Sequence, residues 1–329
     1  MKLKRILAAV LSCALIATSL MAVTGCNGET GTTDPENKTY TVGICQLVQH
    51  PALDAATEGF KKALTEKLGD KVKFDEQNAA GEPANCTTIV NQFVASNVDL
   101  IMANATPALQ AAASATADIP VLATSITEYG VALGIDNFSG KTGINVSGTS
   151  DLAPLDKQAA MFAELLPEAK KVGIIYCSNE ANSKYQVTVV KAELEKAGIE
   201  VTEYSFADSN DIAQVVTKAC DEVDAFYIPT DNQCANNAEL INSIAEPAKK
   251  PIIAGEEGIC KGCGIATLSI SYSTIGYNTG LMAYEILVNG KNPGEMDIQY
   301  DDAPVYKYAP ARCEALGITV PETYEAIAD

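Results

Sequence analysis

The feature that most constrains the fold of this chain is an alternation of short apolar runs with longer stretches of helical periodicity, which begins at Tyr40. Residues 41–45 form an apolar run, and residues 51–68 then carry apolar side chains three to four positions apart until Gly69. Short buried strands that alternate with amphipathic helices predict a parallel sheet with helices on both faces. In this half we expect strands at 41–45, 72–74, 98–102 and 120–123, and helices at 51–68, 86–96 and 107–116.

The same order of elements returns in the second half of the chain. Val98-Asp99 has a counterpart in Val223-Asp224 at an offset of 125 residues, and Pro120-Val121 has one in Pro251-Ile252 at an offset of 131. A pattern that repeats at a nearly constant offset indicates two copies of one structural unit. The predicted fold is therefore α/β, with two Rossmann-like lobes that each contain a parallel sheet and are joined by a hinge. The repeated elements are strands at 171–176, 199–201, 223–228 and 251–254, and helices at 181–197, 211–220 and 234–248.

This repeat also suggests where the lobes begin and end. We expect an N-terminal lobe at 39–148 with part of 274–304, and a C-terminal lobe at 149–273 with part of 305–329. Residues 142–150, between the lobes, are rich in Gly, Ser and Thr, which tolerate large changes in dihedral angle, so they are the first candidate for the hinge. The final part of the chain adds predicted strands at 264–270 and 305–308 and helices at 274–287 and 311–316, and the sequence leaves open which lobe each joins.

The first 25 residues have the pattern of a secretory signal peptide, a basic segment followed by an apolar run at 6–23. The closing residues Val23-Thr24-Gly25-Cys26 resemble the lipobox of bacterial lipoproteins. This resemblance implies that residues 1–25 are removed and that Cys26 is acylated, for example with palmitate. Residues 26–38 would then be a flexible tether that holds an extracytoplasmic domain at the cell membrane. The alternative is an uncleaved transmembrane anchor, although the run is at the short end of the ~20 residues that a span needs.

The charge of the chain is strongly acidic. There are 42 Asp and Glu residues against 23 Lys and Arg residues, so the formal net charge is −19. Phosphate backbones repel a chain of this sign, so we expect no nucleic-acid partner.

Catalytic, metal and cofactor sites are not expected in this sequence. His50 is the only histidine, which rules out a site with several histidine ligands and leaves one possible Ser-His or Cys-His pair. A secreted enzyme that uses His50 would lack the G-x-S-x-G motif. Cys260 and Cys263 have the spacing of a metal or redox pair, but they stand without a second pair, so we interpret them as a loop disulfide or two free thiols.

Candidate ligand-binding residues follow from the rule that ligands bind beyond the carboxyl ends of parallel strands. The segments at these ends are short and polar, without Arg or Lys, which suits a zwitterion better than a phosphorylated ligand. Hydroxyl and amide groups at helix starts would hold a carboxylate, Asp231 or Glu256 would pair with an ammonium group, and Gln46 and His50 would line a side-chain pocket. The predicted ligand-binding residues are Gln46, His50, Thr106, Thr124, Asn179, Asn182, Ser183, Asp231, Asn232 and Glu256.

Four of these segments also carry a resemblance to a known family. Residues 46–55, 105–108, 178–183 and 229–232 resemble the ABC transporter substrate-binding lipoproteins, which include tryptophan-binding members. The resemblance implies a type I periplasmic-binding-protein fold, two lobes that close on a ligand, and delivery of that ligand to an ABC permease with its ATPase. It departs from the family at residues 254–257, where an Asp- or Ser-rich turn is expected, and this departure bears on the ammonium partner.

We therefore expect a monomeric solute-binding protein for an aromatic amino acid, tryptophan first. A sugar or nucleoside receptor, and a solute sensor without transport, are the alternatives.

Overall fold

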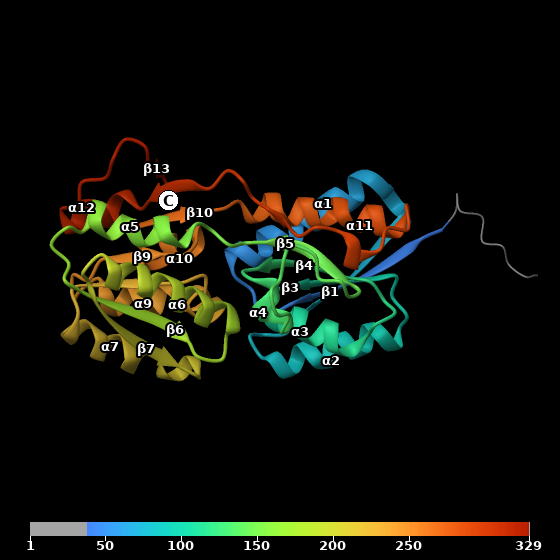
Figure 1. Ribbon diagram of the computed structural model, residues 1–329, viewed down its shortest axis with the longest axis horizontal. Helices are drawn as coiled ribbons and strands as arrows, with labels where there is room; N and C mark the ends of the chain where they lie inside the picture. Colours follow the sequence, from blue (N-terminus) through green and yellow to red (C-terminus); the bar gives the residue numbers. More distant parts are fainter. Residues whose placement is uncertain (1–37, 329) are drawn as a thin grey trace, which may run out of the picture. The chain divides into compact units, whose positions relative to one another are not determined.

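The computed structural model describes residues 38–328. The predicted signal peptide, the lipidation at Cys26 and nearly all of the predicted tether lie outside the described residues. From Thr39 onward the chain is one unit, which contains two α/β lobes with a sheet in each (Figure 1). None of the described helices is long and apolar enough to cross a membrane.

The sheet of the first lobe has six strands, in the order β11-β5-β4-β3-β1-β2, and all neighbours are parallel. Helices α1 and α11 pack on one face, where Ile44, Phe60 and Met282 meet, and α2 and α3 pack on the other face (Figure 1). The strands are β1 (Tyr40–Gln46), β2 (Val72–Asn78), β3 (Leu100–Asn104), β4 (Val121–Ile126), β5 (Val146–Ser150) and β11 (Gln299–Tyr300), and the helices are α1 (Pro51–Leu68), α2 (Pro83–Ala95), α3 (Thr106–Ala115), α4 (Tyr129–Leu133) and α11 (Tyr272–Leu287).

The sheet of the second lobe has seven strands, in the order β13-β12-β10-β9-β8-β6-β7. All neighbouring strands are parallel except β10 and β12, so β12 and β13 run opposite to the other five strands. Helices α5, α6 and α12 cover one face, and α7, α9 and α10 cover the other. The strands are β6 (Lys171–Cys177), β7 (Glu200–Phe206), β8 (Ala225–Ile228), β9 (Ile252–Ala254), β10 (Ala266–Ser269), β12 (Val305–Tyr308) and β13 (Glu325–Ala326), and the helices are α5 (Leu155–Leu165), α6 (Ala181–Lys196), α7 (Ile212–Glu222), α8 (Asn232–Asn236), α9 (Ala238–Ala245), α10 (Glu257–Cys263) and α12 (Pro310–Leu316).

The chain passes between the two sheets three times, at 151–154, 270–271 and 301–304. The candidate hinge at 142–150 was placed too early, because residues 146–150 form β5, a fully buried strand that pairs with β4 and β11. The crossing begins only at Asp151. Hydrogen bonds join the three crossings: the Tyr272 hydroxyl donates to Asp151 Oδ2 at 3.0 Å, and the Ser271 N–H donates to Asp301 Oδ2 at 2.7 Å.

Most predicted elements exist, with bounds shifted by a few residues, and the differences have local causes. The predicted helix at 234–248 is broken at Asn237 into α8 and α9. Thr106 is the first residue of α3 and not its N-cap; the N-cap is Ala105, at a φ of 91° and without a side-chain cap. Three helices, α4, α5 and α10, were not predicted, and two of them are seven residues or shorter.

The cysteines of the described chain are buried and free, including Cys260 and Cys263. These two lie in α10 and not in a loop. They pack in the apolar core of the second lobe, so a disulfide there is not part of the fold.

Candidate ligand-binding site between the lobes

A narrow polar pocket with a cavity volume of about 10 Å³ lies where the two lobes meet. This is far below the ~300 to 1,000 Å³ usual for small-molecule sites, so the lobes must move apart to admit a ligand larger than water. The first lobe contributes residues at the starts of α1 and α11 and at the end of β4, the second contributes the starts of α6, α8 and α10, and the first crossing contributes Asp151. The lining residues are His50, Leu53, Ser125, Asp151, Asn182, Thr230, Asp231, Asn232, Ala235, Glu256 and Tyr272.

Four side-chain atoms in this pocket are buried and have no hydrogen-bond partner: His50 Nδ1, Ser125 Oγ, Asp151 Oδ1 and Asn182 Oδ1. Only two other side-chain atoms of the described chain are in this state, on Asn104 and Thr267. A buried polar group without a partner costs about 1 to 3 kcal/mol, so four of them in one pocket indicate that a ligand completes their hydrogen bonds.

Asp151 is the carboxyl group of the pocket that has an oxygen, Oδ1, without a hydrogen-bond partner. It starts the first crossing, directly after β5, and its Oδ2 atom accepts the hydrogen bond from Tyr272. Burial raises the pKa of Asp151 to about 6, and hydrogen bonds from Tyr272 and Thr127 oppose this rise. A cation beside Oδ1 would remove the cost of burying this charge.

His50 precedes the first turn of α1 and is buried. Its Nε2 atom lies 3.3 Å from Oδ1 of Asn232, on the opposite lobe. Burial lowers the pKa of His50, and the neighbouring Asn232 and Asp54 oppose this change. A second contact between the lobes is the hydrogen bond from Gln233 Nε2 to the Gly81 carbonyl, at 3.2 Å.

Glu180 positions the start of α8 in the second lobe. Its carboxylate accepts hydrogen bonds from the Asn182 and Asn232 side-chain amides and from the backbone N–H groups of Asn232 and Gln233. Burial and the nearby Asp231 raise the pKa of Glu180 to about 8, while its N–H donors favour the charged form. This network fixes the side-chain amides of Asn182 and Asn232 with their nitrogens toward Glu180.

Asp231 and Glu256 line the pocket as predicted, but both serve as helix caps. Asp231 accepts hydrogen bonds from the Cys177 and Cys234 N–H groups and from the Ser183 hydroxyl. Glu256 accepts them from the first N–H groups of α10. Burial raises the pKa of Asp231, and it raises the pKa of Glu256 to about 7. Their oxygens have partners within the lobe, so Asp151 is the better placed carboxylate for a ligand cation.

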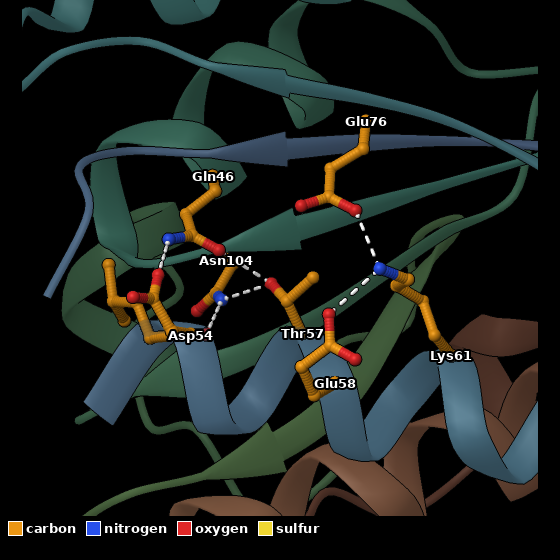
Figure 2. A network of polar contacts seen from close by, with 8 residues as sticks. Gln46, Asp54, Thr57, Glu58, Lys61, Glu76 and Asn104 are labelled. Carbon is orange, nitrogen blue, oxygen red and sulfur yellow. Dashed lines mark hydrogen bonds and ion pairs between the residues drawn. The ribbon is translucent and has the colours of Figure 1, made fainter. Parts of the chain in front are cut away.

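Gln46 lies outside the pocket, in a network that joins β1 to α1 and β3 (Figure 2). Its amide donates to Asp54 at 2.7 Å and accepts from the Thr57 hydroxyl at 2.7 Å, and Asn104 donates to Thr57 at 2.9 Å. On the next turns of α1, Lys61 pairs with Glu58 and Glu76 (Figure 2). Gln46 therefore holds the helix that carries His50.

Four other predicted residues also do not line the pocket. Thr124 is buried and accepts a hydrogen bond from Thr149 between β4 and β5. Ser183 supports Asp231 from behind, and Thr106 is buried at the start of α3. Asn179 is exposed and donates to the Ala207 carbonyl.

Sequence reasoning missed Ser125, Asp151 and Tyr272. Asp151 follows the end of β5 directly, so the strand-end rule would have found it if residues 146–150 had been assigned as a strand. Ser125 has a φ of 59°, within an irregular part of the β4–β5 pairing, which has no clear sequence signal. Tyr272 reaches the pocket from the start of α11, and only the tertiary structure places it there.

Together, two parallel α/β lobes and a polar pocket between them define a solute-binding protein with the type I periplasmic-binding-protein fold. The chain belongs to the ABC transporter substrate binding protein family, whose model matches residues 41–329. The expected fold class and family are thereby confirmed, and members of this family bind solutes and are not enzymes. They work with the components of an ABC transporter, outside the cytoplasm.

Three relatives show how far the similarity extends. A tyrosine-binding protein of Clostridioides difficile is 37% identical over 307 residues, which cover 90% of this chain and 88% of that protein. An ABC domain from Streptococcus pneumoniae in complex with L-Trp is 33% identical with a TM-score of 0.84, over 88% of this chain and 100% of that one. A substrate-binding protein with adhesive properties from Clostridium difficile, in its ligand-free, open structure, is 36% identical with a TM-score of 0.67. The match covers 88% of this chain and 99% of that one.

The two TM-scores differ although the two identities are similar. The present structure follows the tryptophan complex over its length more closely than it follows the open, ligand-free protein. A change in the angle between lobes lowers a TM-score without changing either lobe. The hydrogen bonds between the lobes agree with a closed arrangement.

Proposed function

We propose that this protein is the solute-binding component of an ABC importer and that it binds an aromatic amino acid by closure of its two lobes. It works outside the cytoplasm as a monomer, held at the cell membrane by a lipid on Cys26. The observation that carries the proposal is the convergence of four unpartnered polar atoms from both lobes and one crossing on a single pocket. The tyrosine-binding relative and the relative in complex with L-Trp support an aromatic amino acid as the ligand.

In this proposal the ligand ammonium group pairs with Asp151. Asp151 is a fully buried carboxyl group with a free oxygen in the pocket, and no Arg or Lys lines the pocket beside it. The Ser125 hydroxyl is the unpartnered group that can donate to the ligand carboxylate. His50, Asn182, Asp231, Asn232 and Glu256 form the remaining polar wall, while Gln46, Thr106, Thr124, Asn179 and Ser183 support it from behind or lie apart from it.

Closure follows from the distribution of these groups. A ligand that contacts His50 and Ser125 on one lobe and Asn182 on the other has more contacts in the closed form than in the open form. It therefore shifts the equilibrium toward closure by the difference between its affinities for the two forms. The enclosed ligand can then be presented to the permease and its ATPase.

The direct test is isothermal titration calorimetry of residues 39–329 against the twenty amino acids. We expect a response to aromatic amino acids, and Asp151→Asn should weaken binding about 10- to 100-fold, because a hydrogen bond to a charged group contributes about 1.5 to 3 kcal/mol. Asp136→Asn removes the same charge from an exposed position and should leave the affinity unchanged.

Several outcomes would contradict this function. A response to sugars or nucleosides but to no amino acid would favour the alternative receptor class. Equal affinities of the wild-type protein and Asp151→Asn would remove Asp151 from the site. Unchanged amino-acid uptake in cells that lack this protein would favour a sensor over an importer component.

A further inference from the structure

The hydrogen bonds around His50 determine which of its ring nitrogens carries the proton. The Asn232 side-chain nitrogen donates to Glu180 at 2.7 Å, so the Asn232 oxygen must face His50. An amide oxygen only accepts hydrogen bonds, so the Nε2 atom of His50 must be the donor. Rotating the Asn232 amide would place its oxygen against Glu180 Oε2, which already accepts hydrogen bonds from the Asn182 amide and the Asn232 N–H, so two acceptor oxygens would face each other.

The Nδ1 atom of His50 consequently carries no proton and can only accept a hydrogen bond. Burial favours the neutral imidazole by lowering the pKa of His50, whose relative exposure is only 7%. Its Nδ1 atom is buried in the wall of the pocket and has no partner in the protein. A ligand satisfies this atom only if it presents an N–H or O–H group there.

The aliphatic side chains that line the pocket, Leu53 and Ala235, follow His50 and its partner Asn232 closely in the chain. Leu53, at the start of α1, is three residues after His50, and Ala235 is three residues after its partner Asn232 in α8. Asn232 and Ala235 lie on one face of α8 because they are three residues apart, and Leu53 is in the first turn of the helix that follows His50. The carboxyl groups of Asp151 and Glu256 come from other elements, a crossing and the start of α10. An aromatic ring would therefore lie against Leu53 and Ala235, beside His50.

We propose that the Nδ1 atom of His50 determines specificity by selecting aromatic amino acids that carry a hydrogen-bond donor on the ring. The preferred class has a phenol O–H or an indole N–H, and phenylalanine is discriminated against because it leaves Nδ1 buried without a partner. The inference rests on the proposed function and adds to it the chemistry of the side chain.

The first test uses the unmodified domain, residues 39–329, and a series of ligands in calorimetry. Tyrosine, tryptophan and 4-aminophenylalanine each carry a ring donor, whereas phenylalanine and O-methyltyrosine carry none. We expect the donor-bearing ligands to bind about 10- to 100-fold more tightly than phenylalanine, the usual effect of one buried unsatisfied acceptor. Equal affinities for phenylalanine and tyrosine would overturn the inference and leave the proposed function standing, whereas no response to any aromatic amino acid would refute the proposed function itself.

A pair of variants assigns the selection to Nδ1. His50→Gln can keep a donor toward Asn232 at the place of Nε2 but removes the acceptor at the place of Nδ1, so the ratio of tyrosine to phenylalanine affinity should fall toward one. His50→Asn puts an amide near the place of Nδ1 and should retain part of this ratio. An unchanged ratio in His50→Gln would overturn the role of Nδ1. If a variant does not fold, as judged by circular dichroism, the ligand series on the unmodified protein decides the question.

Discussion

At the scale of single residues, the site combines buried carboxyl groups with no Arg or Lys in the pocket. Asp151 differs from the other acids because one of its oxygens is open, whereas Glu180, Asp231 and Glu256 are held by N–H donors of their own lobe. Burial of a charge without a partner is costly, and a ligand cation offsets this cost. Ligand binding at the proposed site therefore depends on whether Asp151 is ionised.

Ligand affinity should consequently depend on pH. Burial raises the pKa of Asp151 to about 6 in the empty pocket, and an ammonium group beside the carboxylate would lower it again. Affinity is thus full above this pKa and falls as pH decreases through it, by about tenfold at one pH unit below. Glu256, with its pKa raised to about 7, adds to the same trend, and His50 stays neutral because burial lowers its pKa.

Calorimetry with tyrosine at pH 5.0 and 7.5 measures this dependence. Tighter binding at pH 7.5 is expected, with a smaller difference in Asp151→Asn. An affinity that is the same at both pH values would show that the ligand cation does not meet a titrating carboxyl group.

At the scale of elements, the starts of α1, α6, α8 and α10 form the pocket, and their positions depend on how the helices pack on the sheets. The clearest constraint is the contact between α1 and α11, where a Cβ atom on Gly276 would lie 2.0 Å from the Ala56 carbonyl oxygen. Only glycine allows the two backbones to approach so closely. Since α1 carries His50 at its start and α11 begins at Tyr272, this contact relates two lining residues of the pocket to each other.

Gly276→Ala should therefore destabilise the protein. The added methyl group meets backbone and not a flexible side chain, so the helices must separate, at a cost of about 1 to 3 kcal/mol. This cost opposes the ~1 kcal/mol that alanine normally gains over glycine in a helix. Urea denaturation measures the free energy of unfolding, and Ser273→Ala, on the exposed side of the same helix, is the matched control. A Gly276→Ala protein as stable as the control would contradict the close packing.

At the scale of the whole molecule, the three crossings link the two lobes, and Asp151 lies on the first of them. Its two oxygens face different groups, since Oδ2 accepts from Tyr272 of the neighbouring α11 start and Oδ1 faces the pocket. Closure without a ligand buries this carboxylate without a cation, which disfavours the empty closed form. In the proposed mechanism, ligand binding removes this penalty, so occupancy and closure are coupled.

Small-angle X-ray scattering of residues 39–329 checks this coupling. The radius of gyration should fall when tyrosine is added to the wild-type domain. Ligand-free Asp151→Asn should have a smaller radius than ligand-free wild type, because closing no longer buries an unpaired charge. Equal radii for the two ligand-free proteins would argue against a role of Asp151 in opening, and Asp136→Asn controls for the change in net charge.

By itself, the sequence determined the two-lobed α/β design, since apolar periodicity and its repeat follow from which side chains must be buried along each element. It also predicted His50, Asn182, Asp231, Asn232 and Glu256, which line the candidate pocket, because the carboxyl ends of parallel strands meet at one edge of each sheet. The tertiary structure decided what these residues do. Whether a carboxylate caps a helix, as Asp231 does, or stays open, as Asp151 does, depends on which donors come within hydrogen-bond distance from segments far apart in the chain. Such distances are set by packing and crossings, and no local pattern of residues encodes them.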